Sequence, residues 1–257
     1  TPEQIQTYLR PMFTTEEIWC QLFSEPGSGS DLASLSTKAV DDGDGFIVNG
    51  QKVWTTLGHL AKWGLIVTRT DPDVPKHRGL TFFIVDMESD GVDVRPLRQI
   101  TGEAEFNEVY FTDVKIPKEN ILGSLGDGWR VSLAILMNER VAIGGNVRER
   151  GSGAPGHLVQ LWNDKELDDP VSRDKLIKLW IEQEAVRLTN VRAFENREKG
   201  TPGPEGSTSK LYEAEINKAS YEFGMEMLGN DALLFPRGYE LTQPELNFEN
   251  ETFGFTD

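Results

Sequence analysis

The stretch that decides the fold reads Trp19-Cys20-Gln21-Leu22-Phe23-Ser24-Glu25-Pro26-Gly27-Ser28-Gly29-Ser30-Asp31. Large apolar residues at 18–23 predict a β-strand, and the proline, glycines and serines that follow predict a loop. Such a loop exposes backbone N–H groups and hydroxyls at the end of a strand, where a phosphate or a flat heterocycle can bind. An ordinary glycine- and serine-rich hairpin loop has the same pattern, so the spacing alone leaves both interpretations open.

The β pattern continues beyond this stretch to residue 122. Asn49-Gly50 lies between apolar runs at residues 46–48 and 53–56, which predicts a tight hairpin. The other predicted strands are residues 33–40, 63–68, 80–85, 92–97 and 108–116. Their spacing is typical of a small antiparallel barrel or sandwich.

After residue 123 the apolar residues recur every three or four positions, which predicts helices. The predicted helices are residues 127–147, 157–162, 170–200 and 209–228, besides a short amphipathic helix at residues 1–13. Asp169 followed by Pro170 is a typical helix start, a capping residue before proline at the first helical position. The helix that follows carries one apolar stripe, formed by Ile177, Ile181, Ala185, Leu188, Val191 and Phe194. We therefore expect an antiparallel bundle, and no helix beyond Gly229.

The composition excludes some classes of partner. Among 257 residues, 42 are acidic and 26 are lysine or arginine, so the formal net charge is −16. This charge argues against binding to nucleic acid and against docking on an anionic membrane. No segment has the length of a membrane span. The loop at residues 71–79 is an exception to the acidic composition, because it contains Lys76, His77 and Arg78. We interpret it as a solvated loop, and a phosphate site is the alternative.

The lone Cys20 has no cysteine in the chain to pair with, which is typical of a reducing compartment. We therefore expect a cytoplasmic protein. A mitochondrial matrix location stays open because the N-terminus looks incomplete.

Three motifs in this order resemble the acyl-CoA dehydrogenase family of flavoproteins. The first is Glu-Pro-Gly-Ser-Gly-Ser-Asp at residues 25–31, the second is Asn-Gly-Gln-Lys-Val-Trp-Thr-Thr at 49–56, and the third covers residues 106–117. The resemblance implies an α+β fold, a small antiparallel β-barrel or sandwich followed by an antiparallel helical bundle. It implies that residues 1–15 end an N-terminal helical domain, 16–122 form the middle β domain, and 123–257 form an incomplete C-terminal helical domain.

The same resemblance implies FAD-dependent α,β-dehydrogenation of an acyl-CoA thioester, with the electrons passing to an electron-transfer flavoprotein. The implied base is Glu139, which removes the α proton while flavin N5 accepts the hydride. The implied cofactor-binding residues are Phe23, Ser24, Gly29, Ser30, Trp54, Thr55 and Thr56. The implied substrate-binding residues are Ser30, Asn138 and Arg140, and no metal site is expected. A homo- or hetero-oligomer, dimeric or tetrameric, is expected.

Alternatives to this assignment stay open. In most of the family the base lies late in the C-terminal domain, and in a minority it lies at the position of Glu139. A Glu-Arg step such as Glu139-Arg140 also occurs as a solvated pair on ordinary helices. Arg148 and Arg150 are the candidates for the family's arginine that reaches the flavin pyrophosphate across a subunit interface.

Two other functions fit the same resemblance. The chain is similar to actinobacterial members that assemble from two different subunits and act on sterol-derived thioesters, so a non-catalytic partner subunit is one alternative. An acyl-CoA oxidase or a flavin monooxygenase on the same scaffold is the other.

Overall fold

The structure is a computed structural model that describes residues 1–99, 104–144, 147–200 and 203–234, with the backbone alone for residues 140–144. The sequence prediction for residues 235–257, and the side chain of Arg140, lie outside the described residues. The chain forms two compact units, residues 1–134 and residues 135–239, and each unit has a hydrophobic core of its own.

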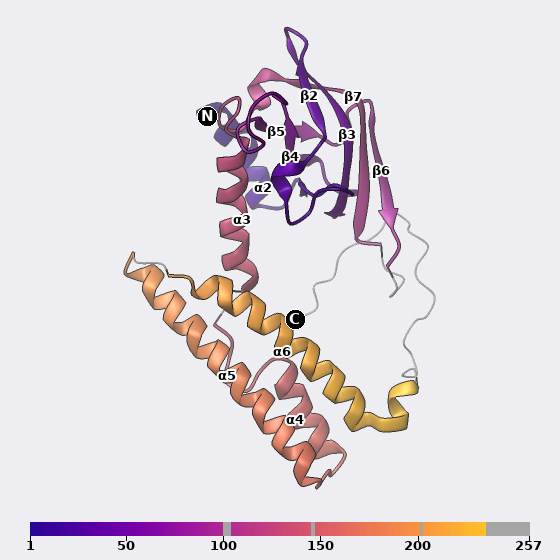
Figure 1. The fold of residues 1–257 in the computed structure, drawn as a ribbon, viewed down its shortest axis with the longest axis vertical. Helices are drawn as coiled ribbons and strands as arrows, with labels where there is room; N and C mark the ends of the chain where they lie inside the picture. Colours follow the sequence, from indigo (N-terminus) through magenta and orange to yellow (C-terminus); the bar gives the residue numbers. More distant parts are fainter. Residues whose placement is uncertain (100–103, 145–146, 201–202, 235–257) are drawn as a thin grey trace. The chain divides into compact units, whose positions relative to one another are not determined.

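The first unit is built on a seven-stranded sheet (Figure 1). Its strands are β1 (Trp19–Leu22), β2 (Lys38–Asp41), β3 (Gly45–Thr56), β4 (Trp63–Arg69), β5 (Leu80–Asp86), β6 (Val92–Leu97) and β7 (Phe106–Pro117). The strand order is β1-β4-β2-β3-β7-β6, and β5 pairs with β4 as well.

The sheet is mixed, because β1 and β2 both pair in parallel with β4. The other pairs are antiparallel, as the sequence predicts. Alternating polarity is the same for both strand directions, so sequence alone does not separate them. The strand predicted at residues 33–40 is confined to Lys38–Asp41, since Leu32–Ser34 form a 3₁₀ turn.

The hairpin predicted at Asn49-Gly50 is wrong, because β3 runs straight through this dipeptide. Asn49 exchanges two hydrogen bonds with Asp113 of β7: its amide donates to Oδ1 at 3.0 Å, and the Asp113 N–H donates to Asn49 Oδ1 at 2.9 Å. Gly50 has φ of +155°, and a Cβ there would lie 2.7 Å from the Cα of Thr37. The glycine therefore serves a close approach of two segments at an irregularity in the β3–β7 register, not a turn.

Leu80 and Phe82 of β5 are fully buried outside the main hydrophobic cluster of the β unit, so its buried residues do not lie on one face of the sheet alone. The main cluster gathers residues from most of the strands. Its buried residues are Cys20, Leu22, Ala39, Phe46, Val48, Ala61, Ile66, Phe83, Val85, Met87, Val109, Phe111, Val114 and Ile116. The N-terminal helical run, formed by α1 (Pro2–Gln4), a π-helix (Ile5–Leu9) and α2 (Arg10–Phe13), packs on this unit. Tyr8 contacts the edges of Trp19 and Trp63, with ring centroids 5.4 and 5.0 Å apart.

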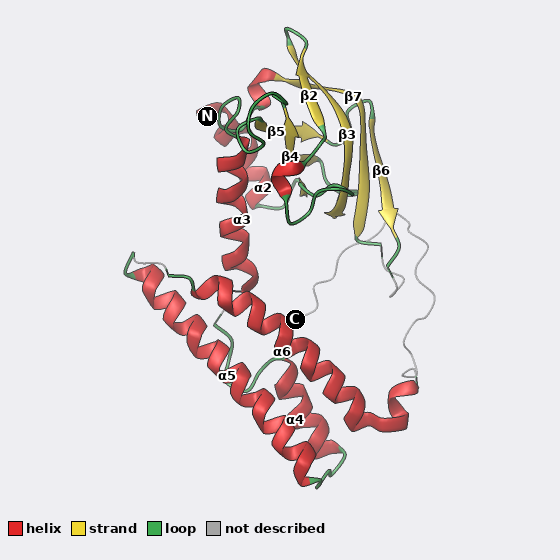
Figure 2. Cartoon of the chain, in the orientation of Figure 1, coloured by secondary structure: helices red, strands yellow, loops and turns green. Residues whose placement is uncertain are grey.

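Helices make up the rest of the described chain (Figure 2). They are α3 (Gly128–Gly144), α4 (Ala154–Asp164), α5 (Pro170–Glu198) and α6 (Glu205–Leu228), with short 3₁₀ turns at Lys118–Asn120 and Gly229–Leu233. Asp169 caps α5 as predicted, since its carboxylate accepts from the Ser172 N–H at 2.7 Å. Leu158 of α4, Leu176 and Leu179 of α5 and Phe223 of α6 share one core, which agrees with the predicted bundle of helices.

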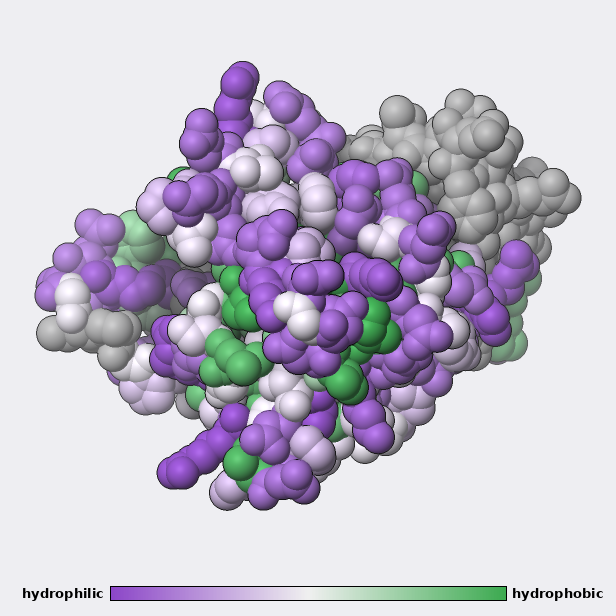
Figure 3. All heavy atoms as spheres, turned by 90° about the horizontal axis from the view of Figure 1, so that it is seen from above, coloured by the Kyte–Doolittle hydropathy of each residue, from purple (hydrophilic) through white to green (hydrophobic). Residues whose placement is uncertain are grey.

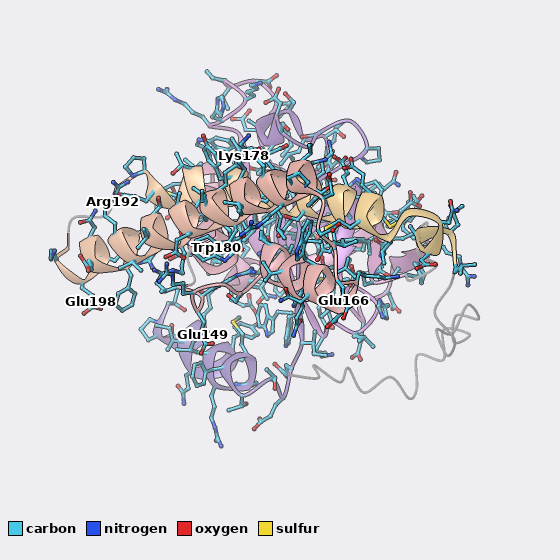
Figure 4. All side chains as sticks on the ribbon, turned by 90° about the horizontal axis from the view of Figure 1, so that it is seen from below. Glu149, Glu166, Lys178, Trp180, Arg192 and Glu198 are labelled. Carbon is cyan, nitrogen blue, oxygen red and sulfur yellow. The ribbon has the colours of Figure 1, made fainter. Side chains whose placement is uncertain are left out.

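The buried stripe of α5 differs from the predicted one. Within the described residues, α5 buries Leu176, Leu179, Gln183, Val186, Asn190 and Ala193. The predicted stripe is instead largely exposed in this unit: Ile181 is 55% exposed and Leu188 is 53% exposed. The buried stripe has the same spacing but includes the polar residues Gln183 and Asn190. It is therefore less apolar than the predicted stripe, and hydropathy alone selects the wrong one. Figure 4 shows α5 along its length, with Lys178, Trp180, Arg192 and Glu198 labelled.

The surface agrees with the acidic composition. Seen from above, the described residues present a mainly hydrophilic surface with small separate hydrophobic patches (Figure 3). Among the described helices, none combines the length and the apolar composition that crossing a bilayer requires.

The role of Gly50 gives a first prediction. In Gly50→Ala the new methyl group meets the Thr37 backbone at an unfavourable φ, so the free energy of unfolding should fall by about 2 kcal/mol or more. Urea denaturation measures this change. The matched control is Gly43→Ala, where φ is +100° but no atom lies within 4 Å, and the loss should be about 1 kcal/mol. Equal losses in the two variants would show that the approach to Thr37 is unimportant.

A candidate flavin site

The loop after β1 is a tight turn closed by its own backbone. Glu25 and Ser28 exchange backbone hydrogen bonds at 2.8 and 3.0 Å, so Pro26 and Gly27 form the tip. The buried Ser28 hydroxyl donates to the Asp31 carbonyl at 2.8 Å and fixes the exit of the turn. A Cβ built on Gly27 would meet no atom within 4 Å, so one side of this turn faces open space.

A buried ion pair joins this turn to β3. The Lys52 ammonium donates to Glu25 Oε1 at 2.9 Å and to the Phe23 carbonyl at 3.0 Å. Neither side chain is more than 4% exposed. The Glu25 carboxylate also accepts from the Ser36 N–H at 2.6 Å, the Ser36 hydroxyl at 2.8 Å and the Thr37 N–H at 3.0 Å. The pair therefore connects three segments, residues 23–28, 36–37 and 52.

Both members of the pair are charged near neutral pH. Burial acts to raise the pKa of Glu25, but the Lys52 ammonium and the hydrogen bonds from residues 36 and 37 outweigh it and lower that pKa to about 2. Burial lowers the pKa of Lys52 to about 8, against the opposing attraction of Glu25. The ammonium keeps its proton at pH 7 because the carboxylate beside it offsets part of the desolvation.

Trp54 stands out from β3 at a bulge. The β3–β7 register shifts between Lys52 and Thr55, and Trp54 has φ of +61°, which is unusual for a residue other than glycine. The strand turns the indole outward, where it is 60% exposed and contacts only the edge of Phe106 among the described aromatic rings. Strained backbone of this kind persists where the surroundings enforce it, often at ligand sites.

The residues after Trp54 are held from β7. Asn107 is fully buried, and its amide donates to the Thr55 carbonyl at 3.0 Å. The Thr55 side chain is buried too, and its hydroxyl oxygen has no hydrogen-bond partner among the described residues. Thr56 is exposed. A ligand on this side can therefore reach the side chains of Trp54 and Thr56 more directly than that of Thr55.

The two predicted cofactor-binding segments lie side by side. The Val53 N–H donates to the Ser24 carbonyl at 2.9 Å, which places the half-buried Ser24 next to the bulge. Phe23 is buried and packs edge-on against Phe82, so only its backbone can face a ligand. Gly29 and Ser30 are exposed at the end of the turn.

The loop at residues 71–79 packs against the same turn. Lys76 forms an ion pair with Asp31 at 2.7 Å and donates to Ser34 at 3.2 Å. Arg69 donates to the Lys76 carbonyl at 2.7 Å. The Lys76 side chain thus contacts the turn while staying 46% exposed, and Arg78 is exposed as well.

The predicted base and two of the three predicted substrate-binding residues, Asn138 and Arg140, lie on α3. Asn138 is exposed and Glu139 is half-buried, and both fall in the second unit. The side chain of Arg140 lies outside the described residues. The first turn of the same helix belongs to the β unit, where Trp129 contacts His77 with ring centroids 4.7 Å apart.

The two arginines of the linker before α4 are both engaged within the helical unit. Arg148 forms an ion pair with Glu213 at 2.7 Å and lines a hollow of about 650 Å³ together with Ser207, Lys210 and Asn217 of α6. Arg150 lies over the ring of Trp180, 5.4 Å from its centroid. The Arg150 side chain is nonetheless the more exposed of the two, at 71% against 45% for Arg148, so both stay candidates.

The residues of the β unit fit a flat heterocyclic cofactor. An exposed indole, exposed hydroxyls of Ser30 and Thr56, and the open face of a glycine turn gather around two adjoining backbone segments. The buried Thr55 hydroxyl, for which the described residues offer no hydrogen-bond partner, is a further polar group in the same segment. Aromatic faces and a few placed polar groups are the usual lining of cofactor sites.

Sequence reasoning missed the residues that hold this arrangement, Glu25 and Lys52. Each stands inside one of the quoted motifs, Glu25 next to Ser24 and Lys52 two positions before Trp54. An acid in one motif with a lysine in the other is a signal for pairing. Asn107 was missed as well, although it lies inside the third motif, at residues 106–117.

Two family models match the chain. A model described as the acyl-CoA dehydrogenase middle domain matches residues 20–114, and one described as the acyl-CoA dehydrogenase C-terminal domain matches residues 126–247. The first contains all of the β-unit site, and the second contains Asn138, Glu139 and Arg140.

Individual relatives agree with these models. The Mycobacterium tuberculosis protein named acyl-CoA dehydrogenase FadE34 is 43% identical over 240 residues, which cover 91% of this chain and 33% of that protein. The structure of the ChsE4-ChsE5 complex from Mycobacterium tuberculosis has a TM-score of 0.79 and 30% identity, over 91% of this chain and 62% of that one. The structure named Tcur3481-Tcur3483 steroid ACAD has a TM-score of 0.80 and 27% identity, over 93% of this chain and 62% of that one.

The chain spans less than two thirds of the length of each of these relatives. Both of its units nonetheless match domains of one family, in the order that the family has them. The chain belongs to the acyl-CoA dehydrogenase family.

Proposed function

We propose that this protein catalyses the FAD-dependent α,β-dehydrogenation of an acyl-CoA thioester, with Glu139 as the base. The observation that carries the proposal is the exposed Trp54, held beside Ser24 by a bulge inside the family's middle domain. Bound FAD supplies the acceptor for the hydride that leaves the β carbon of the substrate. The chain's own residues bind and orient the cofactor and the substrate, and one of them removes the α proton.

The residues of the β unit would hold the flavin ring. Trp54 offers an aromatic face, Ser24 and Thr56 offer hydroxyl groups, and Phe23 and Thr55 contribute through their backbone. Gly29 leaves room for close approach, because a Cβ there would meet no atom within 4 Å. Ser30 lies at the exposed end of the turn, where it can contact both the flavin and the substrate.

Glu139 would take the α proton of the thioester. A carboxylate within hydrogen-bond reach of a carbon acid acts as a general base, and a helix fixes its direction. Glu139 is half-buried, which is compatible with access for a substrate. Asn138, one position earlier and exposed, and Arg140, one position later, are proposed to contact the substrate.

The substrate class and the assembly rest on the relatives. One solved relative is named a steroid ACAD, and both solved relatives are named as pairs of two proteins. We therefore include bulky, sterol-derived acyl-CoA thioesters among the proposed substrates and an oligomer of like or unlike subunits as the working form. An electron-transfer flavoprotein is the proposed electron acceptor.

A second candidate is a non-catalytic subunit that completes the site of a different chain. The names of both solved relatives as two-protein assemblies favour this candidate. The two candidates differ in whether the chain's own flavin is reduced by substrate.

The direct test of the proposed function is the visible spectrum of the purified protein, before and after acyl-CoA esters are added without oxygen. A flavin spectrum that bleaches on addition of an ester supports the dehydrogenase. A flavin that no ester bleaches, or no flavin at all, supports the partner subunit. Sustained peroxide formation in air would support an oxidase instead.

The role of Glu139 gives a second prediction. Glu139→Gln keeps the size of the side chain and removes the base, so flavin reduction by acyl-CoA should slow by about a hundredfold or more while FAD binding persists. Stopped-flow absorbance measures the rate. Glu222→Gln, at an exposed glutamate of α6, is the matched control and should keep the rate of the unchanged protein. An unchanged rate in Glu139→Gln would assign the base to another residue.

The role of Trp54 gives a third prediction. Trp54→Ala removes an exposed ring with little packing, so the melting temperature should change little while the Kd for FAD rises by about tenfold. Flavin fluorescence titration of the apoprotein measures Kd. Tyr212→Ala, at an aromatic residue of α6 with a similar exposure of 58%, should leave Kd unchanged. Retention of FAD in Trp54→Ala at the original Kd would remove Trp54 from the site.

A further inference from the structure

The ion pair of Glu25 and Lys52 has an unusual combination of features. Its members are 4% and 0% exposed, yet they lie next to the most exposed part of the candidate site, one residue from Ser24 and two residues from Trp54. Neither residue is among those that would touch the flavin. The pair thus lies directly behind both segments that are proposed to contact it.

Stability alone does not account for this pair. Taking two charges out of water costs free energy that their attraction recovers only in part, and well-packed apolar residues of similar size often serve as well. A buried ionic group is better explained where it fixes one arrangement of the chain among several. At this place the arrangement in question is the relative position of two backbone segments.

The hydrogen bonds show what the pair fixes. Lys52 holds the Phe23 carbonyl at 3.0 Å, so this carbonyl points into the protein and away from a ligand. Because the next carbonyl, that of Ser24, is occupied by the Val53 N–H, the backbone of this segment has a single orientation. Ser24 is left half-buried, with its side chain beside the bulge.

The Glu25 carboxylate also holds a third segment, residues 36–37. Glu25 accepts from Ser36 and Thr37, and Thr37 is the residue against which Gly50 of β3 packs. The turn, the segment at residues 36–37 and β3 are therefore fixed together through one carboxylate. Beyond Lys52, β3 enters the bulge that presents Trp54.

We propose that Lys52 and Glu25 are positioning residues for the flavin, because their buried ion pair sets Ser24 and Trp54 at the spacing that receives the flavin ring. This inference rests on the proposed function and goes beyond it by assigning a role to two residues that do not touch the cofactor. It predicts that removing both charges leaves the melting temperature nearly unchanged but weakens flavin binding.

The test compares single variants with a double variant. Lys52→Met or Glu25→Gln alone leaves one buried charge without a partner, so each should lower the melting temperature. The double variant removes both charges and should melt near the unchanged protein. If the pair positions the flavin segments, the double variant should still bind FAD about tenfold more weakly, the value of about one hydrogen bond.

The readouts are the melting temperature of the apoprotein, Kd for FAD, and the visible absorption and circular dichroism of bound flavin. The flavin bands of the double variant should be shifted, because the ring lies differently between Ser24 and Trp54. The matched control is Lys62→Met with Asp86→Asn, a pair at 3.1 Å whose side chains are 33% and 35% exposed. It should leave both Kd and the flavin bands unchanged.

The outcomes separate this inference from the proposed function. A double variant that binds FAD with unchanged Kd and unchanged bands overturns the positioning role and leaves the proposed function intact. A protein that binds no FAD before any substitution overturns both. If the double variant does not fold, Glu25→Asp is the deciding variant. It keeps the negative charge but moves the carboxylate away from Lys52 by one methylene group. In Glu25→Asp, Kd should rise severalfold, and an unchanged Kd overturns the proposal.

Discussion

The candidate site depends on one buried electrostatic contact, the ion pair between Glu25 and Lys52. Each charge makes several hydrogen bonds, and the partners come from three stretches of chain. A buried charge tolerates few arrangements, because any movement that breaks one of its hydrogen bonds leaves it unsatisfied in a medium of low polarity. The pair thus converts a flexible glycine and serine turn into a rigid part of the sheet.

The bulge of β3 determines the direction of Trp54, next to the segment that the ion pair fixes. A regular strand would send alternate side chains to opposite faces, and Lys52 and Trp54 would lie on the same face. The extra residue in β3 and the positive φ of Trp54 break this alternation, so that the lysine is buried and the indole is exposed. Asn107 holds the far side of the bulge through the Thr55 carbonyl. The strained backbone at Trp54 is therefore held by Lys52 on one side and by Asn107 on the other.

Much of the fold could be predicted from the sequence, and the exceptions have physical causes. The periods of two and of three to four residues located most strands and helices, and Asp169-Pro170 located the start of α5. The Asn49-Gly50 hairpin failed because the partner of Asn49, Asp113, is distant in sequence and absent from any local pattern. The predicted stripe of α5 was wrong because the buried face includes Gln183 and Asn190 and is less apolar than the exposed one. The resemblance supplied the proposed site residues. The contacts of Glu25 and Lys52 behind them are seen only in the folded structure, because a pair of charges distant in sequence produces no periodic pattern.

The strand order of the sheet also affects how the chain acquires its structure. β1 pairs with β4, and β3 pairs with β7 from Gly45↔Pro117 to Thr56↔Phe106, so the contacts that close the sheet join residues far apart in sequence. The helical unit also joins distant segments, because Leu158 of α4 and Phe223 of α6 share its core. Contacts between distant residues form more slowly than local ones because longer loops must close first. The ion pair of Glu25 and Lys52 joins the turn that carries Ser24 to β3, so it forms only when both segments are in place. The turn therefore acquires its final geometry together with β3 and not from its own sequence alone.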